Sequence, residues 1–414
     1  MSVFKPFCGL RPIAALAASI ASRPYDVMNR EEAKEEAAGN SHSFLHIIRA
    51  EIDLPDSVGD YDQTVYDKAK ENFAQWITDN IFVQDPSPNF YIYEQEWLGY
   101  KQTGIMGLIS TDDYLNDIIK KHEFTRPAKE LDRINHMKTT GLHAEPILTA
   151  YPAVKEIDEI VAALVQQQEP DYNFIAPDGI RHTLWAITQP ALNQTLQQLF
   201  DQKVPAIYIA DGHHRAASSV KVALHCRQNN PNHTGYEDYN FILAVAFPDN
   251  QLRIIDYNRV IKDLNGLDVA HFLDKISPNF DVQKKTGLYK PEKPRQFSMY
   301  LDGQWYCLTA KPHLYQNTDI IESLDISILS NGLIDPVLGI KDQRTDSRID
   351  FVGGMRGLEE LQRRTDSGEM RLAFALYPVS MAQLIAVADS GNVMPPKSTW
   401  FEPKLRSGLV VHKF

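Results

Sequence analysis

The stretch Tyr208-Ile-Ala-Asp-Gly-His-His-Arg215 decides how we interpret the fold of this chain. The apolar run at 206–210 predicts a buried strand, and Asp211-Gly212 then turns the backbone. The next residues, 216–224, have the composition and apolar spacing of a helix. This order places two histidines and an arginine on the first turn of a helix. We therefore expect the motif to lie on a turn rather than in the core.

A helix N-terminus of this kind is suited to bind an anion. Its free backbone N–H groups and the positive end of its dipole attract phosphate. Arg215 could add a bidentate contact, and Gly212 would let a ligand approach the backbone. Asp211 could hold Mg²⁺, although a turn-forming aspartate is the more common role. The alternative is a turn whose histidines are simply solvated. The predicted phosphate- and nucleotide-binding residues are Asp211, Gly212, His213, His214 and Arg215.

The composition indicates a globular protein and excludes several kinds of partner. The chain has 414 residues, of which 43% are hydrophobic and 23% charged, enough for two or three domains. A net charge of −12 argues against a nucleic-acid or membrane partner. No run approaches the ~20 apolar residues of a transmembrane helix. The apolar run at 13–21 is interpreted as folded chain rather than a signal peptide. Three scattered cysteines without metal-site spacing favour a reducing cytoplasm.

The pattern along the chain predicts three parts. These are an N-terminal α/β region over 1–103, a phosphate-binding core over 104–230, and a C-terminal α+β domain over 231–414 that completes the site. Alternating or apolar runs predict strands, and 3.6-residue spacing predicts helices. The predicted strands include 43–52, 89–96, 103–110, 206–210, 241–247 and 372–376, and the predicted helices include 66–77, 216–224 and 358–364.

A second polar cluster follows His122-Glu123. The pair invites comparison with the HExxH motif of zinc proteases, but position 126 is arginine where the second histidine must be. A carboxylate next to cations suits general base catalysis or the binding of a hydroxyl substrate. A salt-bridge cluster at a helix end is an equally good interpretation from sequence alone.

The third cluster lies in the Pro-rich, irregular segment 394–404. It carries two lysines, Lys397 and Lys404, with Ser398 and Thr399 beside the first. Lysines that flank hydroxyl groups can neutralise a phosphate or carboxylate, and an ordinary surface loop is the alternative. The sequence contains neither GxxxxGK[ST] nor GxGxxG, so a Walker or Rossmann nucleotide site is not supported.

Several motifs together resemble the bacterial DUF1015 family over essentially the whole chain. They are Pro6-Phe7-x-Gly9-Leu10-Arg11-Pro12, Arg23-Pro24-Tyr25-Asp26-Val27, His122-Glu123-x-Thr125, Asp211–Arg215 and Pro396-Lys397-Ser398-Thr399-x-Phe401-x-Pro403-Lys404. From about residue 104 the chain also resembles the archaeal free-serine kinases, which have a ParB/sulfiredoxin-like fold. The same order recurs there: a His-Glu pair, a Pro-led strand such as 146–150, the Asp-Gly-His-His-Arg turn and a late Lys-Thr-Thr segment.

This resemblance implies an α+β fold with a ParB/sulfiredoxin-like core and a set of site residues. It makes Glu123, with His122, the catalytic pair, and it assigns nucleotide phosphates to 211–215. The late segment Lys397, Ser398 and Thr399 matches the substrate-binding region, to which we add Arg133 and Asp26 as candidates. Residues 1–100 have no counterpart in the kinase, and Trp400 and Phe401 replace cationic residues.

The activity implied is phosphoryl transfer between a nucleotide and free serine or phosphoserine, in either direction. The expected cofactor is Mg²⁺ with ATP, ADP or another phosphate donor, and the expected partners are a nucleotide and an amino acid. A ParB-like regulatory module that binds a nucleotide without turnover is the alternative. A sulfiredoxin-like repair enzyme would need a cysteine beside the phosphate turn, where position 213 is histidine.

Overall fold

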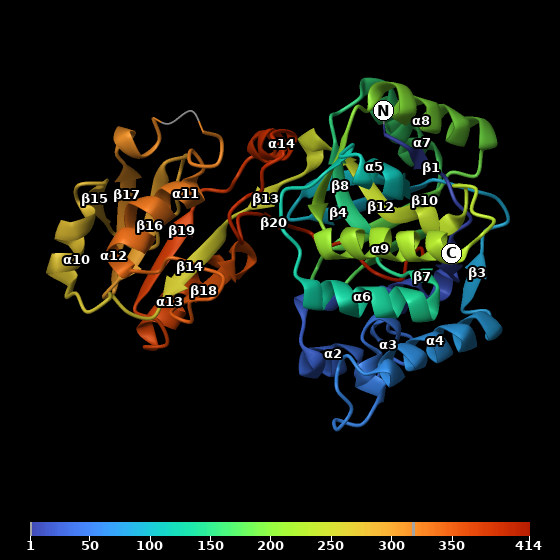
Figure 1. Cartoon of the computed structure of the whole chain (residues 1–414), viewed down its shortest axis with the longest axis horizontal. Coiled ribbons are helices and arrows are strands. Elements are labelled where there is room, and N and C mark those ends of the chain that lie inside the picture. The colour runs from blue at the N-terminus through green and yellow to red at the C-terminus, as the bar shows by residue number, and fades with distance from the viewer. Residues whose placement is uncertain (1, 317–318) are drawn as a thin grey trace. The chain divides into compact units, whose positions relative to one another are not determined.

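The computed structural model describes residues 2–316 and 319–414. Contacts divide the chain into two units (Figure 1). The first unit holds the residues up to Leu252 together with Pro403–Phe414, and the second holds Arg253–Glu402. The extreme C-terminus therefore returns to the unit in which the chain begins.

The first unit is built on a mixed sheet. β12 runs parallel to β8 and β11 parallel to β6, and the other neighbouring pairs are antiparallel. The central strands are buried on both faces, which explains their long apolar runs. The strand order is β6 (Ile119–Lys120), β11 (Ile207–Asp211), β8 (Ile147–Tyr151), β12 (Phe241–Pro248), β5 (Tyr100–Ser110), β4 (Tyr91–Trp97), β10 (Arg181–Ala186) and β9 (Tyr172–Ile175), with β1 (Phe4–Lys5) also beside β5.

A stack of helices covers the β8–β12 region. α9 (His213–Asn229) packs on β8 and β12, α6 (Pro127–Thr140) packs on α9, and α4 (Gln63–Thr78) packs on α6. Figure 1 shows α6 between α9 and α4. The other helices of this unit are α1 (Ala17–Ile20), α2 (Arg30–Ala37), α3 (Leu45–Ile48), α5 (Thr111–Leu115), α7 (Lys155–Gln167) and α8 (Pro190–Lys203).

The strand predicted at 43–52 is wrong. The structure has α3 there, followed by a 3-10 turn at Ala50–Asp53. Phe44, Leu45, Ile47 and Ile48 are all buried in one apolar cluster with parts of α2 and α4. Because the run is short and buried on every side, its apolar pattern could not separate a strand from a helix.

The returning segment 403–414 connects distant parts of the first unit. Bridges join Ser407 to Ser22 and Val411 to Leu10. β21 (His412–Lys413) pairs with β7 (Leu142–His143), and β2 (Leu10–Pro12) pairs with β3 (Phe82–Gln84). The last residues therefore lie beside both the N-terminal segment and the approach to β8.

The second unit has an antiparallel sheet of its own. Val260, Tyr300, Trp305 and Leu361 belong to its buried cluster. The strand order is β15 (Phe280–Lys285), β17 (Gln304–Ala310), β16 (Gln296–Leu301), β19 (Leu372–Leu376), β14 (Tyr257–Ile261) and β18 (Ile349–Gly353). A separate pair joins β13 (Ile254–Ile255) to β20 (Trp400–Phe401), and the helices are α10 (Val269–Ile276), α11 (Asp325–Leu329), α12 (Asp335–Leu338), α13 (Gly357–Asp366) and α14 (Met381–Asp389).

The predicted α+β class is confirmed, and the finer assignment to a ParB/sulfiredoxin-like core stays a prediction. The contact-based division differs from the three predicted parts, 1–103, 104–230 and 231–414. The boundary at 103/104 falls inside β5, and β12 extends the same sheet beyond residue 231. Hydrogen bonding between strands therefore joins segments that composition alone had separated.

Candidate functional site

The Asp-Gly-His-His-Arg motif forms the predicted strand, turn and helix. β11 ends at Asp211, Gly212 adopts φ +97°, and α9 begins at His213. A Cβ atom at position 212 would lie 2.9 Å from Ile147 Cγ2 and 3.1 Å from Arg215 Cζ, so glycine is required here. Among the described residues no side chain caps this end of α9. The backbone amides of the first turn therefore lack the usual side-chain partner.

Arg215 points into the protein rather than out of the turn. Its guanidinium donates to the carbonyl oxygen of Pro146 and lies 3.4 Å from Asp211 Oδ2. His213 and Arg215 are only 5% and 7% exposed, so the expectation that the motif lies outside the core is wrong for these two residues. The reason is that α9 packs between the sheet and α6, which buries positions one and three of its first turn.

Asp211 is held between two cations. Lys404 Nζ lies 3.6 Å from Oδ1, while Arg215 faces Oδ2. Burial raises the pKa of Asp211, but Lys404 and Arg215 outweigh burial and lower it below its usual range. The carboxylate is therefore ionised with its charge compensated. Lys404 was noticed only as part of a Pro-rich segment, because its pairing depends on the return of the C-terminus.

These side chains do not fit a resident metal ion. Across residues 2–316 and 319–414, no group of three or more His, Cys, Asp or Glu side chains could hold one. Asp211, the predicted metal ligand, already has an arginine or lysine facing each of its oxygens. Mg²⁺ usually needs one or two carboxylates in addition to water and substrate phosphates.

His122, Glu123 and His213 come together beside the turn. β6 runs parallel to β11 and brings residues 121–126 next to the start of α9. The His122 backbone N–H donates to His213 Nε2 at 3.4 Å, and the two rings meet edge to face with centroids 4.5 Å apart. His213 Nδ1 lies 4.0 Å from Glu123 Oε2, and the Glu123 side chain is 45% exposed. The structure thus places the predicted base at the turn, within reach of solvent.

The histidines of the site are neutral at pH 7. Burial lowers the pKa of His122 to about 4. Burial, reinforced by neighbouring positive groups, places the pKa of His213 well below its usual value. Since His213 Nε2 accepts a hydrogen bond, its proton resides on Nδ1 and faces Glu123. His214 Nε2 likewise accepts the Arg126 backbone N–H at 2.9 Å, and burial followed by Lys129 lowers its pKa. These rings can donate hydrogen bonds but carry no positive charge.

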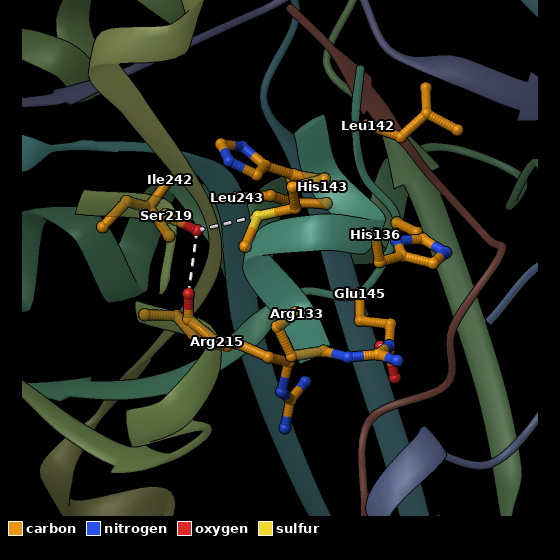
Figure 2. Close-up of a pocket in the computed structure, with 12 residues that line it drawn as sticks. Arg133, His136, Leu142, His143, Glu145, Arg215, Ser219, Ile242 and Leu243 are labelled. Atoms are coloured by element: carbon orange, nitrogen blue, oxygen red, sulfur yellow. Dashed lines mark hydrogen bonds and ion pairs between the residues drawn. The ribbon is translucent and has the colours of Figure 1, made fainter. Parts of the chain in front are cut away.

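A buried ionic cluster lies behind the turn and was not predicted. Glu145 accepts hydrogen bonds from the Tyr25 backbone N–H at 3.0 Å, from Arg133 Nη1 at 3.3 Å and from Ser407 Oγ at 3.3 Å. Figure 2 shows Arg133, Glu145 and Arg215 around a small pocket of about 20 Å³, enough for one water molecule. Glu145 connects the N-terminal segment, α6 and the C-terminal segment. Its only signal in the sequence is its place directly before the Pro146-led strand.

The predicted substrate-binding residues are found in three different environments. Arg133 is buried, with Nη2 2.8 Å from Asp132 Oδ2 and its guanidinium 3.9 Å above the Tyr25 ring, so it acts as a packing and pairing residue. Asp26 is exposed. Lys397, Ser398 and Thr399 belong to the second unit, where buried Arg259 donates to the Lys397 carbonyl oxygen at 2.9 Å. Their part in the site stays a prediction.

Residues 4–327 match the family model described as "Protein of unknown function (DUF1015)". The chain belongs to the DUF1015 family. A search of curated proteins found no match for this DUF1015 protein. No helix in the described part of the chain is long and apolar enough to cross a membrane.

Solved structures similar to this DUF1015 protein include three of low sequence identity. A conserved hypothetical protein from Pyrococcus furiosus is 15% identical over 72% of this chain and 92% of that one, with a TM-score of 0.34. A mutant free serine kinase in complex with AMP is 13% identical over 71% and 86%, with a TM-score of 0.36. C-terminally truncated SbnI from Staphylococcus aureus is 12% identical over 72% and 82%, with a TM-score of 0.36. The function is therefore argued below from the site of this chain.

Proposed function

We propose that this protein transfers a phosphoryl group between a nucleotide and the hydroxyl group of free serine, in one direction or the other. The observation that carries the proposal is the position of Glu123 beside His213 at the uncapped N-terminus of α9. A half-exposed carboxylate suits the hydroxyl group, and a helix N-terminus without a side-chain cap suits the phosphates. The resemblance of the chain from about residue 104 onward to the free-serine kinases supports the choice of serine.

Phosphate binding would rest on the backbone of α9. The protein's task in phosphoryl transfer is mainly to position the reactants and compensate charge. The first-turn amides and the helix dipole supply the anion site, and His214 offers Nδ1–H as a further donor. Lys404 and Arg215 cancel the charge of Asp211, which would otherwise repel the phosphates at the same turn.

Glu123 would act on the serine hydroxyl. In the forward direction its carboxylate takes the hydroxyl proton, the serine oxygen forms a bond to the terminal phosphorus, and the bond from that phosphorus to the leaving nucleotide oxygen breaks. In the reverse direction protonated Glu123 returns the proton to the serine oxygen as it leaves phosphorus. His213 Nδ1–H faces the carboxylate and orients it. Mg²⁺ would enter with the nucleotide as part of the substrate.

Phosphorus NMR tests this function directly. The whole protein is incubated with Mg²⁺ and either serine plus a nucleoside triphosphate or diphosphate, or phosphoserine plus a nucleoside diphosphate or monophosphate. The expected result is growth of the phosphoserine resonance, or its loss with gain of a nucleotide phosphate. Nucleotide binding without turnover would favour the ParB-like regulatory module. Absence of nucleotide binding would contradict both functions.

A further inference from the structure

A second pocket, of about 520 Å³, lies on the N-terminal side of the site. Its walls come from the turn at 25–29, the start of α2, the loop at 56–61 and the first half of α6. The N-terminal region therefore supplies most of this pocket, including Asp26, one of the predicted substrate-binding residues. The pocket is large enough for an amino acid, whereas the pocket behind α9 holds one water at most.

Most charges in this pocket are already paired. Arg30 donates to the carbonyl oxygens of Glu51 and Leu54 and pairs with Asp60 at 3.3 Å. Asp132 is bound by Arg133, and Asp56 by Lys34. These groups hold the walls together and have little left for a ligand.

Three charged lining residues have no ion pair or hydrogen bond from their side chains within the described part of the chain. They are Asp26, Glu31 and Lys129, and all three are exposed. Glu31 lies in the first turn of α2, where a negative charge is favourable for the helix itself. Asp26 and Lys129 have no such explanation. One unpaired carboxylate and one unpaired ammonium in the same pocket complement a zwitterion.

The same two residues lie next to the turn. Arg126, three residues before Lys129, donates its backbone N–H to His214 Nε2. Tyr25, the residue before Asp26, donates its backbone N–H to Glu145 in the cluster behind α9. The charges of Lys129 and Asp26 both act on the pKa of His214, in opposite directions. The pocket is thus adjacent to the anion-binding end of α9.

We infer that this pocket is the amino-acid subsite, in which Asp26 binds the α-ammonium group and Lys129 the carboxylate of serine or phosphoserine. The inference rests on the proposed function and gives it a substrate class: a free α-amino acid with both groups charged. The hydroxyl or phosphate group of that amino acid would extend toward the start of α9. A serine residue within a peptide chain has neither charged group and would be rejected.

Ligand analogues paired with variants test the subsite. Calorimetric titration uses the whole protein with serine, with glycerate, which lacks the ammonium group, and with serinamide, which lacks the carboxylate. The wild type should bind serine better than either analogue. Asp26→Asn should bind serine about 10- to 100-fold more weakly, which is the range expected for loss of a hydrogen bond to a charged group. This variant should also no longer prefer serine over glycerate. Lys129→Met should bind serine more weakly by a similar factor and should no longer prefer serine over serinamide.

Glu31→Gln is the matched control, since it removes a charge from the same pocket and should leave all three affinities unchanged. Melting temperatures of the variants check that the fold is intact. A wild type that does not bind serine, or an Asp26→Asn variant that discriminates like the wild type, would overturn the subsite. If Asp26→Asn and Lys129→Met both turn over serine with the wild-type KM for serine, the subsite is contradicted and the proposed function still stands. If serine, glycerate and serinamide bind in the predicted order but no phosphoryl transfer is detected, the subsite still stands and the proposed function is contradicted.

Discussion

Arg215 belongs to the candidate site by its place in the motif and to the core by the burial of its side chain. Its guanidinium is buried, and it compensates the buried carboxylate of Glu145 and the partly exposed carboxylate of Asp211. We expect Arg215→Ala to destabilise the first unit by about 3 kcal/mol, because Glu145 and Asp211 each lose one of their two cations while Arg133 and Lys404 remain. Chemical denaturation measures the loss. Arg344→Ala in the second unit is the control, since Arg344 is exposed and bonds to nearby Asp342. Equal stability of the two variants would contradict this role.

Lys404 tests the charge balance at the turn. Lys404→Met removes one of the two cations on Asp211, so the carboxylate should repel the nucleotide phosphates. We expect nucleotide affinity to fall about tenfold, corresponding to roughly 1.4 kcal/mol. Isothermal titration calorimetry with the nucleotide measures this loss of affinity. The double variant Lys404→Met with Asp211→Asn should recover most of the affinity. Failure of this rescue would show that Lys404 acts on the ligand directly or only on the fold.

At the scale of elements, the start of α9 depends on the left-handed turn at Gly212. Gly212→Ala combines an unfavourable φ with a Cβ 2.9 Å from Ile147 Cγ2. Gly179→Ala is the control, because its φ is +79° and no atom lies within 4 Å of the added Cβ. We expect the control to lose about 1–2 kcal/mol of stability from the backbone alone. Gly212→Ala should lose more and also lose nucleotide binding. If both variants lose a similar amount of stability and Gly212→Ala still binds nucleotide, the close packing of Gly212 against Ile147 would not be required for the site.

At the scale of the whole molecule, acid should affect the two units differently. The histidines whose pKa is lowered by burial all lie in the first unit: His122, His136, His143, His182, His213, His214 and His412. Below about pH 6.5 the unfolded chain binds protons that these folded imidazoles refuse, so stability falls as pH falls. For His122 and His136, with pKa values of about 4, the loss is about 2 kcal/mol each at pH 5. Glu145 has the opposite effect: burial raises its pKa, so its contribution to stability increases as the pH falls.

Hydrogen exchange followed by mass spectrometry checks this prediction at pH 7 and pH 5. After correction for intrinsic exchange, protection should decrease in peptides of the first unit and change less in the second. Carboxylates whose pKa is lowered, such as Asp211, titrate below this window and so do not contribute to the comparison. Equal loss in the two units, or greater protection of the first, would show that the histidines do not govern its acid stability.

Local patterns predicted the turn itself. The apolar run, the Asp-Gly pair and the helical spacing of 216–224 agree with β11, Gly212 and α9 because each depends on neighbouring residues. His122-Glu123 was also found from its own residue types, and the structure places it beside the turn. Where the pattern was short and buried on all sides, as at 43–52, the same reasoning failed.

The rest of the site depends on contacts between residues far apart in the chain. Glu145 meets Tyr25 across 120 positions and Ser407 across 262. Lys404 reaches Asp211 only because the C-terminus returns to the first unit. No spacing rule can predict such pairs, since they follow from the path of the chain between them. The inward direction of Arg215 was missed for the same reason: it follows from the packing of α6 on α9.

The central claim is that Glu123 accepts the serine proton, and Glu123→Gln tests it most directly. The change is nearly isosteric and removes the charge and the proton-accepting capacity. Nucleotide affinity and melting temperature should match the wild type, while the rate of phosphoryl transfer measured by phosphorus NMR should fall about 10²–10⁴-fold. A Glu123→Gln protein that transfers phosphate between nucleotide and serine at the wild-type rate would contradict the account.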